Sequence, residues 1–214
     1  GAQPSGIREL FEFGRQRAKE VGAENVFDFS LGNPSIPAPG MVAEAISKTL
    51  TEVSPVAVHG YTSAAGSDAC RDAIAENLNS RYSTGYTRNN VFITCGAAPA
   101  LVATFRALAD DDGGSEFIVI APFFPEYRVF IGNAGGKPVI VPPDTDRFQI
   151  DFNALETAIN ERTAAVLINS PNNPSGVVYT EGTIKMLAKL LEEKSREFGH
   201  PIFLVSDEPY RELV

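Results

Sequence analysis

The chain has 214 residues, of which 43% are apolar and 21% charged, and this composition is typical of a globular protein. A net charge of −9 and the lack of any basic run exclude a protein built to follow a nucleic-acid backbone. No apolar stretch approaches the ~20 residues needed to span a bilayer, no leader pattern opens the sequence, and its two cysteines are too few for a secreted disulfide framework. We therefore expect a cytoplasmic globular domain, alone or with a small appendage, and no membrane or nucleic-acid partner.

The N-terminal part of the chain carries two helical patterns. Apolar residues at helical spacing predict a helix over residues 7–21, which Gly22 ends. Pro39 favours the start of a second helix, expected over residues 41–50. Residues 52–66 show no periodicity and are expected to form a loop.

From Ser67 onward, apolar runs of strand length alternate with helical stretches. Ser67 is the expected N-cap of the first of these helices. Strands separated by helices indicate the α/β class, with a mostly parallel sheet that has helices on both faces and strands covered on both sides. The expected strands cover residues 91–94, 117–121, 138–141, 164–168 and 202–205, and the expected apolar face of the first helix consists of Cys70, Ile74 and Leu78.

Unusual residues follow four of the expected strands. Ligands of open α/β sheets bind beyond the carboxyl ends of the strands, so these positions are the ones to examine. The small residues around Gly96 either leave free N–H groups for an anion at a helix start or form an ordinary tight turn. Phe123 and Phe124 either display a ring toward a planar ligand or both belong to the core.

The other two strand ends are polar. Segment 169–176 either holds its side-chain amides rigidly between prolines or forms a plain turn. Asp207, at the end of an expected buried strand, either needs a positive partner or caps a helix. An anion cradle, an aromatic ring, an amide and a carboxylate on one sheet edge suit a flat ligand with a phosphate at one end and a basic ring nitrogen at the other. Pyridoxal phosphate is such a ligand.

These segments resemble the class I aminotransferases of the aspartate aminotransferase type, which are pyridoxal phosphate enzymes of fold type I. The resemblance covers the whole chain and is most specific in residues 172–176 (NNPSG) and 206–210 (SDEPY), with support from residues 31–34, 60–62 and 94–98. It implies the N-terminal half of an enzyme that moves an amino group between an amino acid and a 2-oxo acid. It also implies a homodimer with shared active sites. Residues 1–40 would belong to a small domain, and residues 41–214 would form an incomplete pyridoxal phosphate-binding large domain.

The resemblance implies a role for each motif residue. Asp207 would pair with the pyridine nitrogen, and Tyr210 and Asn173 would hydrogen-bond the phenolic oxygen of the ring, so these three are the expected catalytic residues. Asn173 would also contact the substrate carboxylate, in a pocket lined by Gly32. The other expected cofactor contacts are Gly96, Ala97 and Ala98 at the phosphate, Phe124 stacked on the ring with Phe123 packed inward, and Tyr61 at the phosphate of the neighbouring subunit.

Two departures from the family pattern bear on function. Ala97 and Ala98 offer no hydroxyl and Pro99 has no N–H, so this loop is expected to bind phosphate more weakly than that of many relatives. None of the six lysines stands at the position of the family's Schiff-base lysine. That lysine, and the arginine that binds the substrate carboxylate, are expected beyond Val214.

Three other functions fit part of the pattern. A lyase or a cyclopropane-forming synthase of the same fold would share the cofactor-binding residues, which do not determine the reaction. An effector domain of a regulator would need a DNA-binding segment, and none precedes Ile7 in this sequence. A dinucleotide-binding domain would need a glycine fingerprint, which is absent. No metal site is expected.

Overall fold

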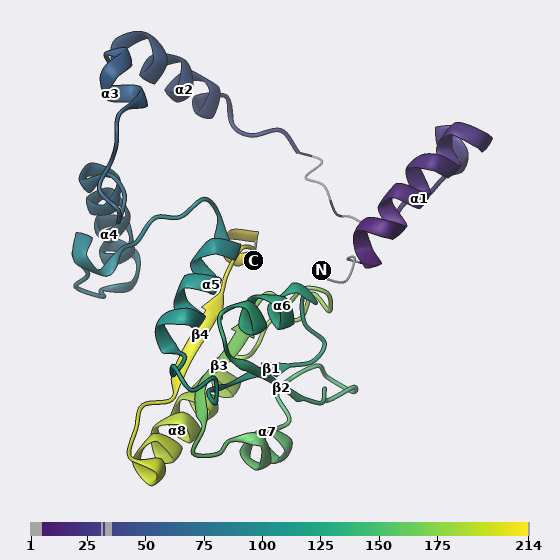
Figure 1. Cartoon of the computed structure of the whole chain (residues 1–214), viewed down its shortest axis with the longest axis vertical. Helices are drawn as coiled ribbons and strands as arrows, with labels where there is room; N and C mark the ends of the chain where they lie inside the picture. The colour runs from purple at the N-terminus through teal and green to yellow at the C-terminus, as the bar shows by residue number, and fades with distance from the viewer. Residues whose placement is uncertain (1–5, 31, 33–35, 214) are drawn as a thin grey trace. The chain divides into compact units, whose positions relative to one another are not determined.

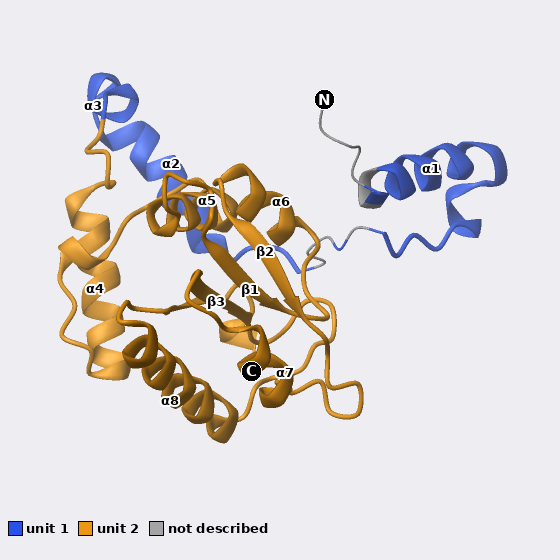
Figure 2. Cartoon of the chain, turned by 60° about the horizontal axis from the view of Figure 1, so that its bottom comes forward, with its two compact units in different colours: residues 1–61 blue, residues 62–214 orange. Residues whose placement is uncertain are grey.

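The computed structural model (Figure 1) describes residues 6–30, 32 and 36–213. The chain forms two compact units, residues 1–61 and residues 62–214, which Figure 2 shows in different colours. These units are defined by contacts within this chain. The predicted domain boundary between residues 40 and 41 concerns the complete enzyme and stays a prediction.

The first unit is helical. The helices expected over residues 7–21 and 41–50 are both present, but residues 52–66 are not a continuous loop as predicted. A short helix begins there because Pro55 occupies its first turn and the side chain of Ser54 accepts a hydrogen bond from the Ala57 N–H. The elements of this unit are α1 (Gly6–Val21), η1 (Ala23–Asn25), α2 (Gly40–Glu52) and α3 (Pro55–His59).

The second unit contains a sheet of four strands in the order β2-β1-β3-β4, all parallel, as the sequence predicts. Four of the five expected strands are present within a few residues of their predicted ends. The strands are β1 (Glu116–Ile120), β2 (Lys137–Val141), β3 (Thr163–Asn169) and β4 (Phe203–Asp207). The helices are α4 (Asp68–Tyr82), η2 (Arg88–Asn90), α5 (Ala97–Leu108), α6 (Glu126–Asn133), α7 (Phe152–Ala158), α8 (Glu181–Phe198) and η3 (Arg211–Leu213).

Helices cover both faces of this sheet, as predicted. Alternate residues of β1 and β3 point to opposite faces and join two separate hydrophobic clusters. On one face Ile118 and Val166 pack with Leu155 of α7 and Leu187 of α8. On the other face, β1 and β3 residues pack with α5 and α6 in a cluster rich in aromatic rings, whose fully buried members include Phe105, Phe117 and Tyr127.

Three expectations for the sheet unit are wrong. Residues 91–94 do not form a strand, because no described strand lies beside them to form a ladder. The Ile93 N–H instead donates to the Ala65 carbonyl, at 3.0 Å. The run 202–205 is not covered on both sides, since β4 is an edge strand whose Phe203 and Leu204 are 46% and 40% exposed. The predicted face of α4 is largely exposed, and the buried residues of that helix are Arg71 and Ala75.

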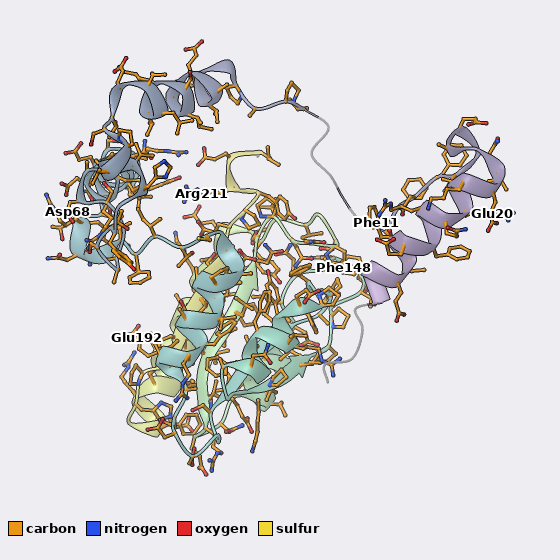
Figure 3. The ribbon with its side chains drawn as sticks, turned by 45° about the horizontal axis from the view of Figure 1, so that its top comes forward. Phe11, Glu20, Asp68, Phe148, Glu192 and Arg211 are labelled. Atoms are coloured by element: carbon orange, nitrogen blue, oxygen red, sulfur yellow. The ribbon has the colours of Figure 1, made fainter. Side chains whose placement is uncertain are left out.

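Polar contacts rather than an apolar face fix α4. The guanidinium of Arg71 is buried and donates to the carbonyl oxygens of Arg88 (2.7 Å) and Val91 (2.9 Å). At the other end of the helix, Arg81 makes a two-bond ion pair with Glu212 of η3, at 2.8 and 3.0 Å. Figure 3 shows the side chains of this region, with Asp68 and Arg211 labelled. The ion pair connects α4 to the segment that follows β4.

Candidate functional site

Asp207 is the last residue of β4 and is held at two points. Its Oδ2 accepts a hydrogen bond from the Tyr127 hydroxyl at 2.5 Å, and its main-chain oxygen accepts one from the Asn169 Nδ2 at 2.9 Å. Within residues 6–30, 32 and 36–213, no lysine or arginine forms an ion pair with Asp207. The positive partner that the sequence predicts for this carboxylate is therefore not supplied by the described residues.

Tyr127 lies in the first turn of α6 and is 2% exposed. Burial raises the pKa of its phenol well above the ordinary value, and the hydrogen bond to the Asp207 carboxylate raises it further. The hydroxyl therefore stays protonated and remains a hydrogen-bond donor at every physiological pH. Tyr127 was not predicted as a site residue, because its partner is 80 residues away in the chain and no local pattern indicates the contact.

The segment before α5 is a tight turn that leads directly into the helix. Gly96 is the N-cap of α5 and has a φ of 100°, a conformation that residues with a side chain rarely adopt. The Thr94 hydroxyl donates to the Gly96 carbonyl at 2.7 Å and fixes the turn. No side chain in the described part of the chain caps this helix, which leaves the N–H groups of Ala97 and Ala98 available to a ligand.

The helix start and the carboxylate border the same hollow. Ala97 and Leu101 of α5 lie on one side of a cavity of about 410 Å³, and residues 205–209 and Arg211 lie on the other. The structure therefore brings together the predicted phosphate end and the predicted ring-nitrogen end of the site. A volume of this size falls in the range of small-molecule pockets, roughly 300–1,000 Å³.

Asn173 and Tyr210 line a neighbouring hollow of about 310 Å³. The Asn173 Nδ2 lies 3.5 Å from the Tyr210 hydroxyl, at the limit of a hydrogen bond. Asn169 at the end of β3 connects this pair to Asp207, since its Oδ1 accepts from the Asn173 N–H at 2.6 Å while its Nδ2 donates to the Asp207 carbonyl. The sequence did place Asn169 in an amide-rich segment but did not identify it as the residue that joins the two strand ends.

The two phenylalanines of the predicted aromatic site are both partly buried against the aromatic cluster. The Phe124 ring meets the Tyr127 ring edge to face, with centroids 5.6 Å apart and planes at 82°. Exposure does not separate Phe123 from Phe124. The assignment of Phe124 to a ligand ring and of Phe123 to the core therefore stays a prediction.

Two predicted site residues lie in the other compact unit. Gly32 and Tyr61 belong to residues 1–61 and are exposed there. The other residues of the Gly32 motif, Leu31, Asn33 and Pro34, lie outside the described residues. Their predicted roles therefore stay predictions.

The lysines of α8 are engaged elsewhere. Lys185 and Lys189 pair with carboxylates of their own helix, at 2.6 and 3.7 Å. Lys194 lies 2.9 Å from Glu197 and 3.7 Å from Glu156, and the hydrogen bond to Glu197 raises the pKa of its amine. None of these three amines lines the hollow beside Asp207.

Comparison with known proteins identifies the family. The model of the aminotransferase class I and II family matches residues 24–214. The chain belongs to this family. Among curated relatives, it is 33% identical over 201 residues to a probable aspartate/prephenate aminotransferase of Aquifex aeolicus and 32% identical over 200 residues to the aspartate aminotransferase of Bacillus subtilis. Each alignment covers 92% of this chain and 48% of the relative.

Solved structures of the family have the same fold. An amino transferase from Eubacterium rectale is 57% identical and superposes with a TM-score of 0.96 over 100% of this chain and 54% of that chain. The aspartate aminotransferase of Thermus thermophilus, solved with maleate, is 29% identical with a TM-score of 0.84 over 99% and 52%. The fold class is therefore confirmed, and the chain spans about half the length of the relatives that it matches.

Members of the aminotransferase class I and II family generally depend on pyridoxal phosphate. In the described residues, no helix is both long and apolar enough to cross a membrane. The same residues contain no group of three or more His, Cys, Asp or Glu side chains arranged to hold a metal ion.

Proposed function

We propose that this chain is the N-terminal half of a pyridoxal phosphate-dependent aminotransferase that moves an amino group between an amino acid and a 2-oxo acid. The observation that carries this proposal is the shared hollow of Asp207 and the α5 N-terminus, in a chain that belongs to the aminotransferase class I and II family. This chain spans only 48% of the length of these two curated relatives. The activity is therefore assigned to the full-length protein.

The residues present fit pyridoxal phosphate at both ends. The uncapped N-terminus of α5 offers N–H groups and the positive end of a helix dipole to a phosphate. At the other end, a carboxylate with no cationic partner among the described residues matches a protonated ring nitrogen. The cofactor, when bound, supplies a ring that accepts electrons from the substrate α-carbon.

The chain's own residues then have distinct tasks. Asp207 keeps a proton on the ring nitrogen, because an adjacent carboxylate stabilises the charged form of that group. Tyr210 and Asn173 would hydrogen-bond the phenolic oxygen of the bound cofactor, and Asn173 would also contact the substrate carboxylate. Phe124 would cover one face of the bound ring and exclude water from it. Gly96, Ala97 and Ala98 hold the phosphate through the backbone, with Gly32 at the substrate pocket.

The amine that holds the cofactor comes from the part of the protein beyond Val214. Support for this proposal comes from the α8 lysines, whose amines contact carboxylates and do not line the site. A nucleophilic amine must lose its proton, and the hydrogen bond from Lys194 to Glu197 opposes that loss. Borohydride reduction of the full-length protein with bound cofactor, followed by mass mapping, should place a stoichiometric adduct outside residues 1–214. An adduct on one of the six lysines of this chain would refute the assignment.

The active sites are shared between two subunits. Family members are typically dimeric, and Tyr61 is fully exposed and lies outside the sheet unit. In mixed dimers of Tyr61→Phe subunits with subunits that lack the cofactor-binding lysine, both defects should fall in one site and leave the other intact. Recovered activity supports sharing, whereas heterodimers that form without recovery contradict it.

The activity itself is tested with Asp207→Asn in the full-length protein. This variant should still bind pyridoxal phosphate but lose most of the rate of α-proton removal in single-turnover experiments, because the neutral amide no longer keeps the ring nitrogen protonated. The control is Glu192→Gln, the same chemical change on an exposed side chain of α8 labelled in Figure 3. Wild-type kinetics in Asp207→Asn would refute the role. Product analysis with 2-oxo acids separates a transaminase from a lyase or synthase of the same fold.

A further inference from the structure

The Asp207 carboxylate has one side-chain partner in the described part of the chain, and that partner comes from a helix distant in sequence. The Tyr127 hydroxyl donates to Oδ2 at 2.5 Å, while Oδ1 has no hydrogen-bond partner among the described residues. The backbone of Asp207 is fixed separately, through Asn169. Tyr127 therefore restrains the side chain of Asp207, whereas Asn169 restrains only its main chain.

Packing alone does not account for a hydroxyl at this position. Tyr127 belongs to an otherwise apolar cluster with Phe105 and Phe117, and its ring makes the edge-to-face contact with Phe124. A phenylalanine would provide the same ring contacts without a buried polar group to satisfy. The hydroxyl contributes only its hydrogen bond, and that bond is directed to the carboxylate.

We propose that Tyr127 is a positioning residue of the active site, which holds Oδ2 of Asp207 so that Oδ1 is presented to the ring nitrogen of the cofactor. This inference rests on the proposed function, since it assigns a partner to the carboxylate of that same site. Tyr127 has no part in the resemblance that identified the other site residues. It is inferred from the contact alone.

Two properties of Tyr127 suit this role. Burial keeps the pKa of the phenol high, so the donor is present at any pH at which the enzyme works, and the nearest ionisable groups that raise it further are Asp207 and Tyr210. The α6 helix also places the ring edge-on to Phe124. One side chain thus supports both the residue expected at the ring nitrogen and the residue expected on the ring face.

A double-mutant cycle on the full-length protein tests the proposal. The variants are Tyr127→Phe, Asp207→Asn and the double variant, and the measurement is the affinity of each apoprotein for pyridoxal phosphate, followed by absorbance. Tyr179→Phe is the matched control, since Tyr179 is also buried but packs on the opposite face of the sheet. Circular dichroism checks that each variant is folded.

Tyr127→Phe should weaken cofactor binding by about 10-fold to 100-fold, because it removes a hydrogen bond to a charged group. In the Asp207→Asn background, Tyr127→Phe should weaken cofactor binding by less than about threefold, because the two residues act as one unit. Tyr179→Phe should leave the affinity unchanged.

Each alternative outcome contradicts one proposal. Equal effects of Tyr127→Phe in both backgrounds, or a folded Tyr127→Phe with wild-type affinity, would overturn the role of Tyr127. The same conclusion follows if Tyr127→Phe fails to fold while Tyr179→Phe folds, since the hydroxyl would then be structural. Failure of the wild-type protein to bind pyridoxal phosphate would instead overturn the proposed function.

Discussion

The two faces of the sheet are covered by different kinds of side chain. The face under α7 and α8 is filled mainly by aliphatic side chains such as Ile118 and Leu187. The face under α5 and α6 is rich in aromatic rings, and Tyr127 carries a hydroxyl from that cluster to Asp207 at the edge of the sheet. The difference indicates that one face supplies stability, while the other also supports the site.

The largest effect is expected from a cavity on the aliphatic face. Leu187→Ala removes a fully buried side chain of α8 and should lower the free energy of unfolding by about 2–5 kcal/mol. Cofactor affinity of the folded protein should change less than about twofold, because this cluster does not reach the hollow. Urea unfolding and cofactor titration of the full-length protein measure the two quantities. Leu190→Ala, at a partly buried position of the same helix, is the control and should lower the free energy of unfolding by less.

A smaller effect distinguishes the two rings of the aromatic face. Phe124→Leu should weaken cofactor binding by about 2- to 12-fold, the equivalent of an aromatic contact worth ~0.5–1.5 kcal/mol. Phe123→Leu should instead lower stability, by less than about 1.5 kcal/mol, with little change in affinity. Both rings pack against the same cluster, so each is the control for the other. The reverse order of effects would exchange the assignments.

The smallest expected effect is a pH dependence of the free energy of unfolding, to which one buried tyrosine on each face of the sheet contributes. Burial raises the pKa of Tyr127 and of Tyr179 above the ordinary value of 10.0. The unfolded chain therefore releases these protons first, so the stability that the neutral phenols contribute is complete below pH 10 and is lost as the pH rises above it. Replacing either tyrosine by Phe should flatten the fall in unfolding free energy above pH 10. A variant that unfolds with the wild-type slope in that range would contradict the shift.

Much of the fold follows from local patterns in the sequence. The continuous apolar runs in β1 and β3 predict buried strands, and alternation with helices predicts a parallel sheet, as observed. The short helix α3 was missed, although Ser54 followed by Pro55 is a recognisable helix start. Residues 91–94 were predicted wrongly because a run with strand composition becomes a strand only beside a partner.

The candidate site was predictable where its residues stand in motifs at strand ends. Asp207, Asn173 and the turn at Gly96 were identified in this way, and the structure gathers them at the carboxyl edge of the sheet. Tyr127 was not, because nothing within one strand or helix indicates a contact with a residue 80 positions away. Only the packing of α6 against β1 and β3 brings the two side chains together.

The pairing of Lys194 has a consequence for chemical footprinting. Amine-directed reagents attack the unprotonated amine, and the pKa of this amine is raised by its hydrogen bond to Glu197. Its side chain is also only 17% exposed, compared with 75% for Lys185 and 76% for Lys189 on the same helix. In a timed acylation experiment Lys194 should therefore be the slowest of the three to label. Lys194 also lies 3.7 Å from Glu156 of α7, so separation of α8 from α7 should speed up its labelling.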